Sequence, residues 1–204
     1  MFKRYFKEYI LKNKYDLTVL LIMLITGIMV GIGIYIFSDA SIKEEVIHKA
    51  TEVFKLASSK EYIETNVVAN GIKTNIILLA ILLISSVTLF GRYVIEMLML
   101  LKGAMLSTYS MVLFNVFGVG YGILVVLLLV VLVNLIYIPA YLFLSLLFME
   151  IHFNIFKTKQ SSLNTLEVFG NTIKILIGFV FMFSSVILEQ MASLVALKVF
   201  LKLN

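Results

Sequence analysis

Three polar side chains stand inside long apolar runs of this chain: Asn115, Asn134 and Glu189. Polar groups at membrane depth usually face protein or water rather than lipid, and they are functional candidates for that reason. Amides and a protonated carboxylic acid can hydrogen-bond across helices, each bond contributing about 1 kcal/mol. A proton or ion relay is the alternative, but a relay needs more ionisable groups than one glutamate. The residue types therefore favour structural hydrogen bonds.

Side chains suited to catalysis are scarce. The sequence has no cysteine and two histidines, His48 and His152, which the spans predicted below place on opposite sides of the membrane. Neither histidine has a second histidine or a cysteine at helical spacing, and no phosphate-binding GxxxxGK[ST] loop is present. We therefore predict no enzyme activity, no cofactor and no metal site.

The composition indicates a chain that is embedded in lipid. Hydrophobic residues make up 61% of the 204 positions and charged residues 14%, against about 45–50% and about 25% in soluble domains. The chain has room for four to six helical spans of about 20 residues each and little else. We predict one all-α membrane domain, with the lipid bilayer rather than nucleic acid as its surroundings.

Charge-free runs predict five membrane-spanning helices. The longest such run separates Lys102 from Glu150 and would measure about 70 Å as one helix, far more than a bilayer. It must therefore fold back, and the glycines of GVGYG at 118–122 supply a turn because glycine accepts positive φ angles. The predicted spans are residues 17–37, 74–91, 103–118, 122–149 and 175–197.

The lysines and arginines predict the orientation. Segments 1–16, 91–103 and 150–174 are rich in basic residues and fall on one side of a five-span protein, which the positive-inside rule places in the cytoplasm. Loop 39–72 has more acidic than basic residues and falls outside. We predict a multi-pass cell-membrane protein with a cytoplasmic N-terminus and an extracytoplasmic C-terminus.

The segment 92–103 is apolar but contains Arg92, Glu96 and Lys102. Arg92 and Glu96 are four residues apart, so they share a helical face and can pair. A piece this short predicts a helix at the cytoplasmic interface, interfacial or re-entrant, rather than a full span. Four or six spans would follow if the segment behaves otherwise.

Loop 39–72 contains an amphipathic pattern. Apolar residues recur every three or four positions among lysines and glutamates, which predicts a helix with one apolar face. That face can lie on the bilayer or on the bundle, or it can dock a partner, for which Val46 and Phe54 are the candidate residues.

The span 122–149 carries the only proline of the chain, Pro139. A proline inside a helix frees the carbonyl four residues earlier, here that of Leu135, and kinks the helix. In lipid such a carbonyl needs another partner. We therefore expect this kinked fourth helix to be the centre of the bundle, surrounded by protein, with Asn134 bonded to Asn115 and Glu189. In the first span, Gly27 and Gly31 form a GxxxG pattern that favours close helix packing.

Several motifs occur in a characteristic order: LLKGAMLSTYSMVLFN, GVGYG, VNLIYIPAYLF, MEIHFNIFK and VILEQ. In this order and spacing the chain resembles the stage II sporulation protein M family over essentially its whole length. Lys102-Gly103 and the stretch from Asn134 to Pro139 are the most specific parts. The chain departs from the family at Tyr93, where a proline is common, and at Leu132-Val133, where the family often has Pro-Gln.

The resemblance implies a non-catalytic scaffold for forespore engulfment during endospore formation. Such a protein lies in the mother-cell membrane and anchors and localises two peptidoglycan-degrading enzymes, stage II sporulation proteins D and P. The alternative is a transporter-associated protein or an ABC permease-like subunit. A transporter needs a continuous polar pathway, and one glutamate with two asparagines favours the scaffold.

Overall fold

The structure is a computed structural model that describes residues 8–9, 11–58, 63–157 and 165–203, and all regular elements in these ranges are helical. Within the helices, the side chains of 53–58, 63–71, 157, 165–169, 190, 193–194 and 196–203 are not among those described. The elements are α2 (Lys14–Phe37), α3 (Ala40–Ser58), α4 (Ile63–Ser86), α5 (Gly91–Val126), the π-helical stretch η1 (Leu127–Leu132), α6 (Val133–Lys157) and α7 (Thr165–Leu203). The predicted all-α class is confirmed.

Three described helical stretches are long and apolar enough to cross a membrane: Lys14–Phe37, Gly91–Phe156 and Gly170–Glu189. Ile72–Ser86 is apolar but shorter. The chain is therefore a multi-pass membrane protein by its apolar helices. The stretch Gly91–Phe156 would measure about 100 Å if straight, over three times the hydrocarbon thickness of a bilayer.

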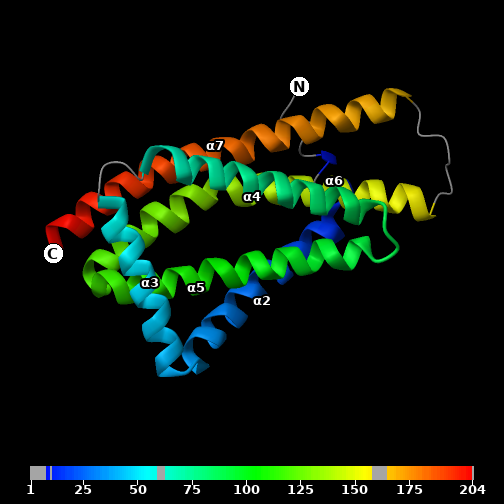
Figure 1. The fold of residues 1–204 in the computed structure, drawn as a ribbon. Helices are drawn as coiled ribbons and strands as arrows, with labels where there is room; N and C mark the ends of the chain where they lie inside the picture. The colour runs from blue at the N-terminus through cyan, green and yellow to red at the C-terminus, as the bar shows by residue number, and fades with distance from the viewer. Residues whose placement is uncertain (1–7, 10, 59–62, 158–164, 204) are drawn as a thin grey trace.

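That long stretch reverses direction at Gly118. Its φ of 71° and ψ of 169° break the helical geometry of α5, and it is the one described glycine with positive φ. Side chains rarely tolerate this conformation, whereas glycine adopts it at little cost. Figure 1 shows the chain running out along α5 and returning toward α6. The turn predicted at GVGYG is confirmed.

Helix α2 packs closely on α5 through glycines. A Cβ atom added at Gly27 would lie under 3.0 Å from the backbone carbonyl of Leu100, and one at Gly31 would meet Ala104 in the same way. Between these helices, Thr108 Oγ1 donates a hydrogen bond to the Gly31 carbonyl oxygen at 3.3 Å. The small-residue face predicted for the first span is confirmed, and its partner is α5.

Ion pairs gather at one end of the bundle, which we call the charged end. Lys12 Nζ lies 2.6 Å from Glu150 Oε1, and Arg92 Nη2 lies 2.7 Å from Asp16 Oδ1. Arg92 Nε also bonds to Glu96 Oε1 at 3.1 Å, which confirms the predicted pair. The N-terminal segment, the start of α5 and the end of α6 therefore meet on one side, as the distribution of basic residues predicted.

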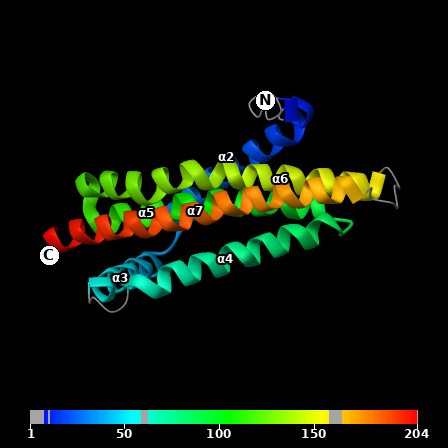
Figure 2. The same ribbon diagram turned by 90° about the horizontal axis from the view of Figure 1, so that it is seen from above.

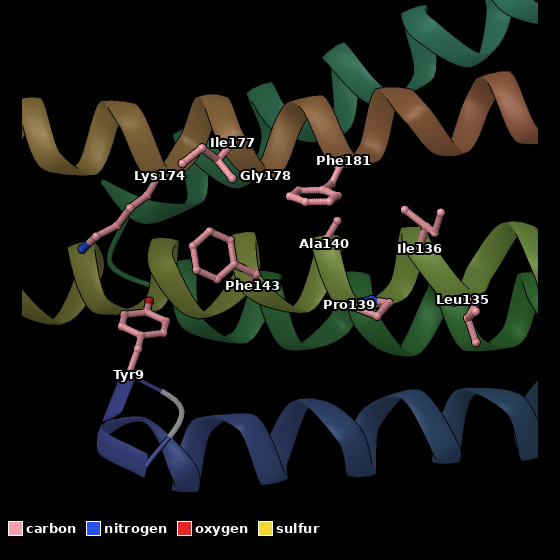
Figure 3. A pocket seen from close by; sticks show the side chains of 10 residues that line it. All are labelled: Tyr9, Leu135, Ile136, Pro139, Ala140, Phe143, Lys174, Ile177, Gly178 and Phe181. Carbon is pink, nitrogen blue, oxygen red and sulfur yellow. The ribbon is translucent and has the colours of Figure 1, made fainter. Parts of the chain in front are cut away.

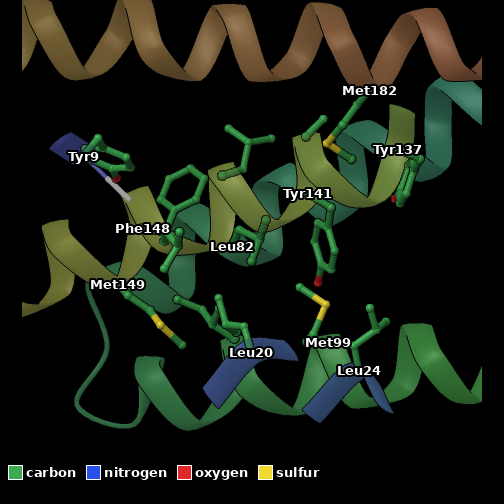
Figure 4. Close-up of a cluster of buried hydrophobic side chains, with 14 residues drawn as sticks. Tyr9, Leu20, Leu24, Leu82, Met99, Tyr137, Tyr141, Phe148, Met149 and Met182 are labelled. Atoms are coloured by element: carbon green, nitrogen blue, oxygen red, sulfur yellow. The ribbon is translucent and has the colours of Figure 1, made fainter. Parts of the chain in front are cut away.

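The main apolar core is centred on α6. Tyr141, Leu144 and Phe148 are almost fully buried there, and α6 packs against α2, α4, α5 and α7. In Figure 4, Tyr141 points from α6 toward Met99 of α5. Seen from above in Figure 2, α5, α6 and α7 lie alongside one another with α4 beside them. The central position expected for the proline-bearing helix is confirmed.

The prediction of a separate interfacial or re-entrant helix is wrong for the segment 92–103. It forms no separate short helix, because α5 continues without interruption from Gly91 past Gly103 to the turn. The chain reverses tightly before it, with the Gly91 amide donating to the Thr88 carbonyl at 3.0 Å. Gly91 permits this reversal because it has no side chain. A Cβ atom at this position would collide with the carbonyl of Ser85.

Candidate functional site

A polar cavity of about 480 Å³ opens between α4, α5, α6 and α7. Four helices each contribute polar side chains to its wall, and we call it the polar cavity. The polar residues lining it are Thr74 and Asn75 of α4, Lys102 and Tyr109 of α5, Asn134 and Tyr137 of α6, and Ser185 and Glu189 of α7.

Lys102 reaches the cavity because α5 starts at the charged end. It follows Arg92 by ten residues, which places it about 15 Å along the helix from that end. This is about half of the 30 Å hydrocarbon thickness of a bilayer. Sequence reasoning placed Lys102 at the cytoplasmic surface because it treated 92–103 as an interfacial segment. The absence of proline between Arg92 and Phe117 was the signal for the longer helix.

Asn134 and Glu189 lie at a similar depth, whereas Asn115 does not. By helical rise, Glu189 is about 22 Å beyond Lys174 and Asn134 is about 24 Å before Glu150. Asn115 is about 34 Å from Arg92 on the same measure, close to the turn at Gly118. It is exposed and does not line the polar cavity. The predicted common height holds for Asn134 and Glu189 and is wrong for Asn115.

The asparagines in the two limbs of the hairpin satisfy their amides locally. Asn134 Nδ2 donates to the Val130 carbonyl at 2.7 Å, and Asn115 Nδ2 donates to the Met111 carbonyl at 2.8 Å. The predicted bond between Asn134 and Asn115 is therefore wrong. Asparagine readily forms such bonds to the backbone four residues earlier, and these compete with bonds across helices.

The cross-helix amide bond comes from Asn75, which sequence reasoning did not single out. Asn75 is 4% exposed, and its Nδ2 donates to the Met182 carbonyl of α7 at 3.4 Å. Its place beside Lys73 and Thr74 resembled the polar end of a span. Helix α4 begins further upstream, at Ile63, so Asn75 falls within the helix and against α7.

Two opposite charges, Lys102 and Glu189, share the cavity and attract each other across it without forming an ion pair. Lys102 Nζ lies 4.0 Å from the centroid of the Tyr137 ring, a cation–π contact. Within the described part of the chain, neither Lys102 nor Glu189 has a hydrogen bond or an ion pair. A charge removed from bulk water is costly unless a counter-charge or hydrogen bonds compensate it. The cavity is therefore suited to a polar occupant.

Pro139 lies on a different face of α6. It is exposed, and Leu135, whose carbonyl it frees, is 72% exposed. Pro139 follows Asn134 by five residues and is therefore about 140° around the helix from it. Helix α6 is unbroken through Pro139, and the irregular geometry lies upstream in η1. The expectation that protein surrounds Pro139 is wrong.

The exposed proline face borders an apolar cavity of about 410 Å³ between α6 and α7. Figure 3 shows Ala140 and Phe143 of α6 and Phe181 of α7 around it, with Pro139 further along α6 and with Lys174 and Tyr9 at one end. Among the described residues, no polar side chain other than these two lines it. The shape of this cavity suits an apolar chain, and its largely apolar wall is not suited to catalysis.

The histidines stand apart, as the sequence predicted. His152 lies by the charged end, its ring 4.8 Å from that of Phe156, and it lines a cavity of about 340 Å³ with Asp16 and Arg92. His48 is on α3, 3.8 Å from Glu52. In the ranges that the structure covers, no three His, Cys, Asp or Glu side chains gather as a metal site would require.

The two candidate docking residues are on α3, which forms as a helix over the predicted amphipathic stretch. Val46 is 41% exposed. The side chain of Phe54 lies outside the described residues.

The fold and the polar cavity define an all-α, multi-pass membrane protein with charged side chains at membrane depth. No family model, no curated protein and no solved structure matches this chain.

Proposed function

We propose that this chain is a non-catalytic membrane scaffold of the stage II sporulation protein M type. In this role it anchors and localises the peptidoglycan-degrading stage II sporulation proteins D and P in the mother-cell membrane during engulfment. The chemistry on the cell wall belongs to those partners.

The observation that carries the proposal is the exposed apolar stripe of α3. Ile42 is 51% exposed and Val46 is 41% exposed, and the two residues lie on one face, four positions apart. Helix α3 starts just after Phe37, about 32 Å along α2 from Asp16 at the charged end. It extends from the opposite end of the bundle (Figure 1). An amphipathic helix in this position can lay its apolar face into a groove of a partner.

The face of α3 beside the stripe is charged. Lys49 Nζ donates to Glu45 Oε1 at 2.6 Å, and this bond lowers the pKa of the Glu45 carboxyl. The carboxyl therefore stays ionised at neutral and mildly acidic pH. A helix with one charged and one exposed apolar face suits the boundary between membrane, water and a partner protein.

The proposed topology has five crossings, with the charged end in the cytoplasm. The crossings are α2, α4, the limb of α5 before Gly118, the limb from Gly118 through η1 and α6, and α7. The clustering of Lys12 and Arg92 at one end supports the orientation, because basic residues flanking spans are retained in the cytoplasm. Helix α3 and the C-terminus then lie outside.

A second candidate function is a role in transport, and the polar cavity favours it. Polar side chains of four helices meet there rather than standing scattered through the bundle. However, Arg92 and Asp16 of the charged end line a different cavity, which shares no described lining residue with the polar cavity. The scaffold remains the function that we propose.

The test is co-purification from solubilised membranes of a sporulating host. Wild type should recover the two wall-degrading enzymes, and the double variant Ile42→Glu with Val46→Glu should lose them while still inserting. The matched control, Ser41→Glu with His48→Glu, adds the same two charges on the opposite side of α3 and should keep them. Recovery of an ATPase in place of the hydrolases would establish the transport alternative, and equal recovery with both double variants would remove α3 from the docking role.

A further inference from the structure

The polar cavity presents a positive and a negative side chain from facing helices. Lys102 comes from α5 and Glu189 from α7, and both line the same space. The two charges attract each other across the cavity, but within the described residues neither forms an ion pair, and Lys102 rests over the Tyr137 ring at 4.0 Å. Since ionisable groups are rare and costly at this depth, a bound group that contacts both charges would complete the compensation that their mutual attraction supplies only in part.

The rest of the wall can orient such a group. Asn75, Asn134 and Ser185 supply amide and hydroxyl groups around the two charges. The volume of about 480 Å³ lies within the range of about 300–1,000 Å³ typical of small-molecule sites. A site with charges of both signs repels a simple anion at Glu189 and a simple cation at Lys102, so it selects a ligand that carries both charges.

We propose that the polar cavity binds a small zwitterionic group, whose acidic end pairs with Lys102 and whose ammonium end pairs with Glu189. This site goes beyond the scaffold function and does not depend on it. Two sources carry this chemistry: the headgroup of a zwitterionic phospholipid that enters from the bilayer, and a free zwitterionic solute.

Native mass spectrometry of the full-length protein tests the lipid source. The probe is a nanodisc of equal parts phosphatidylethanolamine, which carries phosphate and ammonium, and phosphatidylglycerol, which carries phosphate alone. Wild type should retain phosphatidylethanolamine in preference. Glu189→Gln, which keeps the shape of the side chain, should lower that preference about tenfold, the effect of losing one charge-assisted hydrogen bond. Lys102→Met should instead lower the retention of both lipids, because both carry the phosphate that pairs with Lys102, and should leave the preference for phosphatidylethanolamine in place.

Lys174→Gln is the matched control, because Lys174 is also on α7 but lines the apolar cavity. It should leave the preference unchanged. If Lys102→Met does not fold, Glu189→Gln alone decides, with size-exclusion elution and thermal unfolding as checks of folding.

Thermal unfolding in detergent with added phosphoethanolamine tests the free source. A rise in Tm with wild type that Glu189→Gln abolishes identifies a soluble zwitterion as the ligand. Equal retention of the two lipids together with no rise in Tm would overturn the proposal and leave a water-filled cavity. Preferential retention of phosphatidylglycerol would also overturn it, since the site would then be one for simple anions.

Discussion

The glycine contacts between α2 and α5 allow a sharp test of the packing. Gly27 and Gly33 lie in the same helix, and both can be replaced by alanine. A Cβ atom at Gly27 would lie under 3.0 Å from the carbonyl of Leu100, whereas a Cβ atom at Gly33 has no atom within 4 Å. The two substitutions are chemically identical and differ only in what the added methyl group meets.

The magnitude follows from two opposing effects. Replacing glycine by alanine within a helix stabilises it by about 0.5–1 kcal/mol, and this gain is common to both variants. Overpacking a tight contact costs about 1–3 kcal/mol, and at Gly27 the obstacle is backbone that no side-chain rotation can move. Gly27→Ala should therefore be less stable than Gly33→Ala by about 1–3 kcal/mol, because the helix-propensity gain cancels in the comparison.

The assay is reversible unfolding of the purified protein in mixed micelles, with the denaturing detergent as titrant and helix content by circular dichroism as readout. Gly33→Ala should match or exceed wild type, and Gly27→Ala should unfold earlier. If the two variants unfold within about 0.5 kcal/mol of each other, a separation too small for any backbone clash, α2 does not pack on α5 as described.

Three further predictions concern the amides, the turn and the topology. Asn75→Leu should lower stability in the same assay by about 1 kcal/mol, because the Asn75 hydrogen bond crosses from α4 to α7. Asn115→Leu should change stability little, because the Asn115 hydrogen bond stays within α5. A larger loss for Asn115→Leu than for Asn75→Leu would contradict these assignments. Gly118→Val should destabilise the hairpin by about 1–3 kcal/mol because the backbone at φ 71° and ψ 169° accepts essentially only glycine. Gly118→Ala should lose a similar amount, and equal stability of the valine variant and wild type would exclude the turn there. In this cysteine-free chain, single cysteines at Lys14 and Glu44 should react with a membrane-impermeant thiol reagent from opposite faces, and labelling of both from one face would refute the proposed orientation.

Local features of this chain could be read without its tertiary structure. The apolar composition requires lipid around most residues, whatever their arrangement. The turn at Gly118 follows from one residue type that accepts positive φ, and the α3 helix follows from apolar residues at helical spacing. The GxxxG pattern indicates close packing because small side chains let backbones approach. Each of these signals depends only on neighbours in the sequence.

The depth of each polar side chain in the membrane could be assigned only from the tertiary structure. Lys102 resembles the end of a span because a lone lysine at membrane depth is costly, yet α5 passes through it to Gly118. That longer helix moves Asn115 out to the turn. The structure also shows that Asn75, not Asn134, forms the amide bond between helices.

The physical reason is that the cost of a polar group depends on what surrounds it, and its surroundings come from other helices. Lys102 can occupy the middle of α5 because Tyr137 of α6 covers its ammonium group and the polar side chains of α4 and α7 line the same cavity. Pro139 can face outward because its neighbours on that side of α6 are apolar. The sequence by itself determined the solvent, the turn and the helices, whereas only the packing of α4 through α7 decided which polar residues meet.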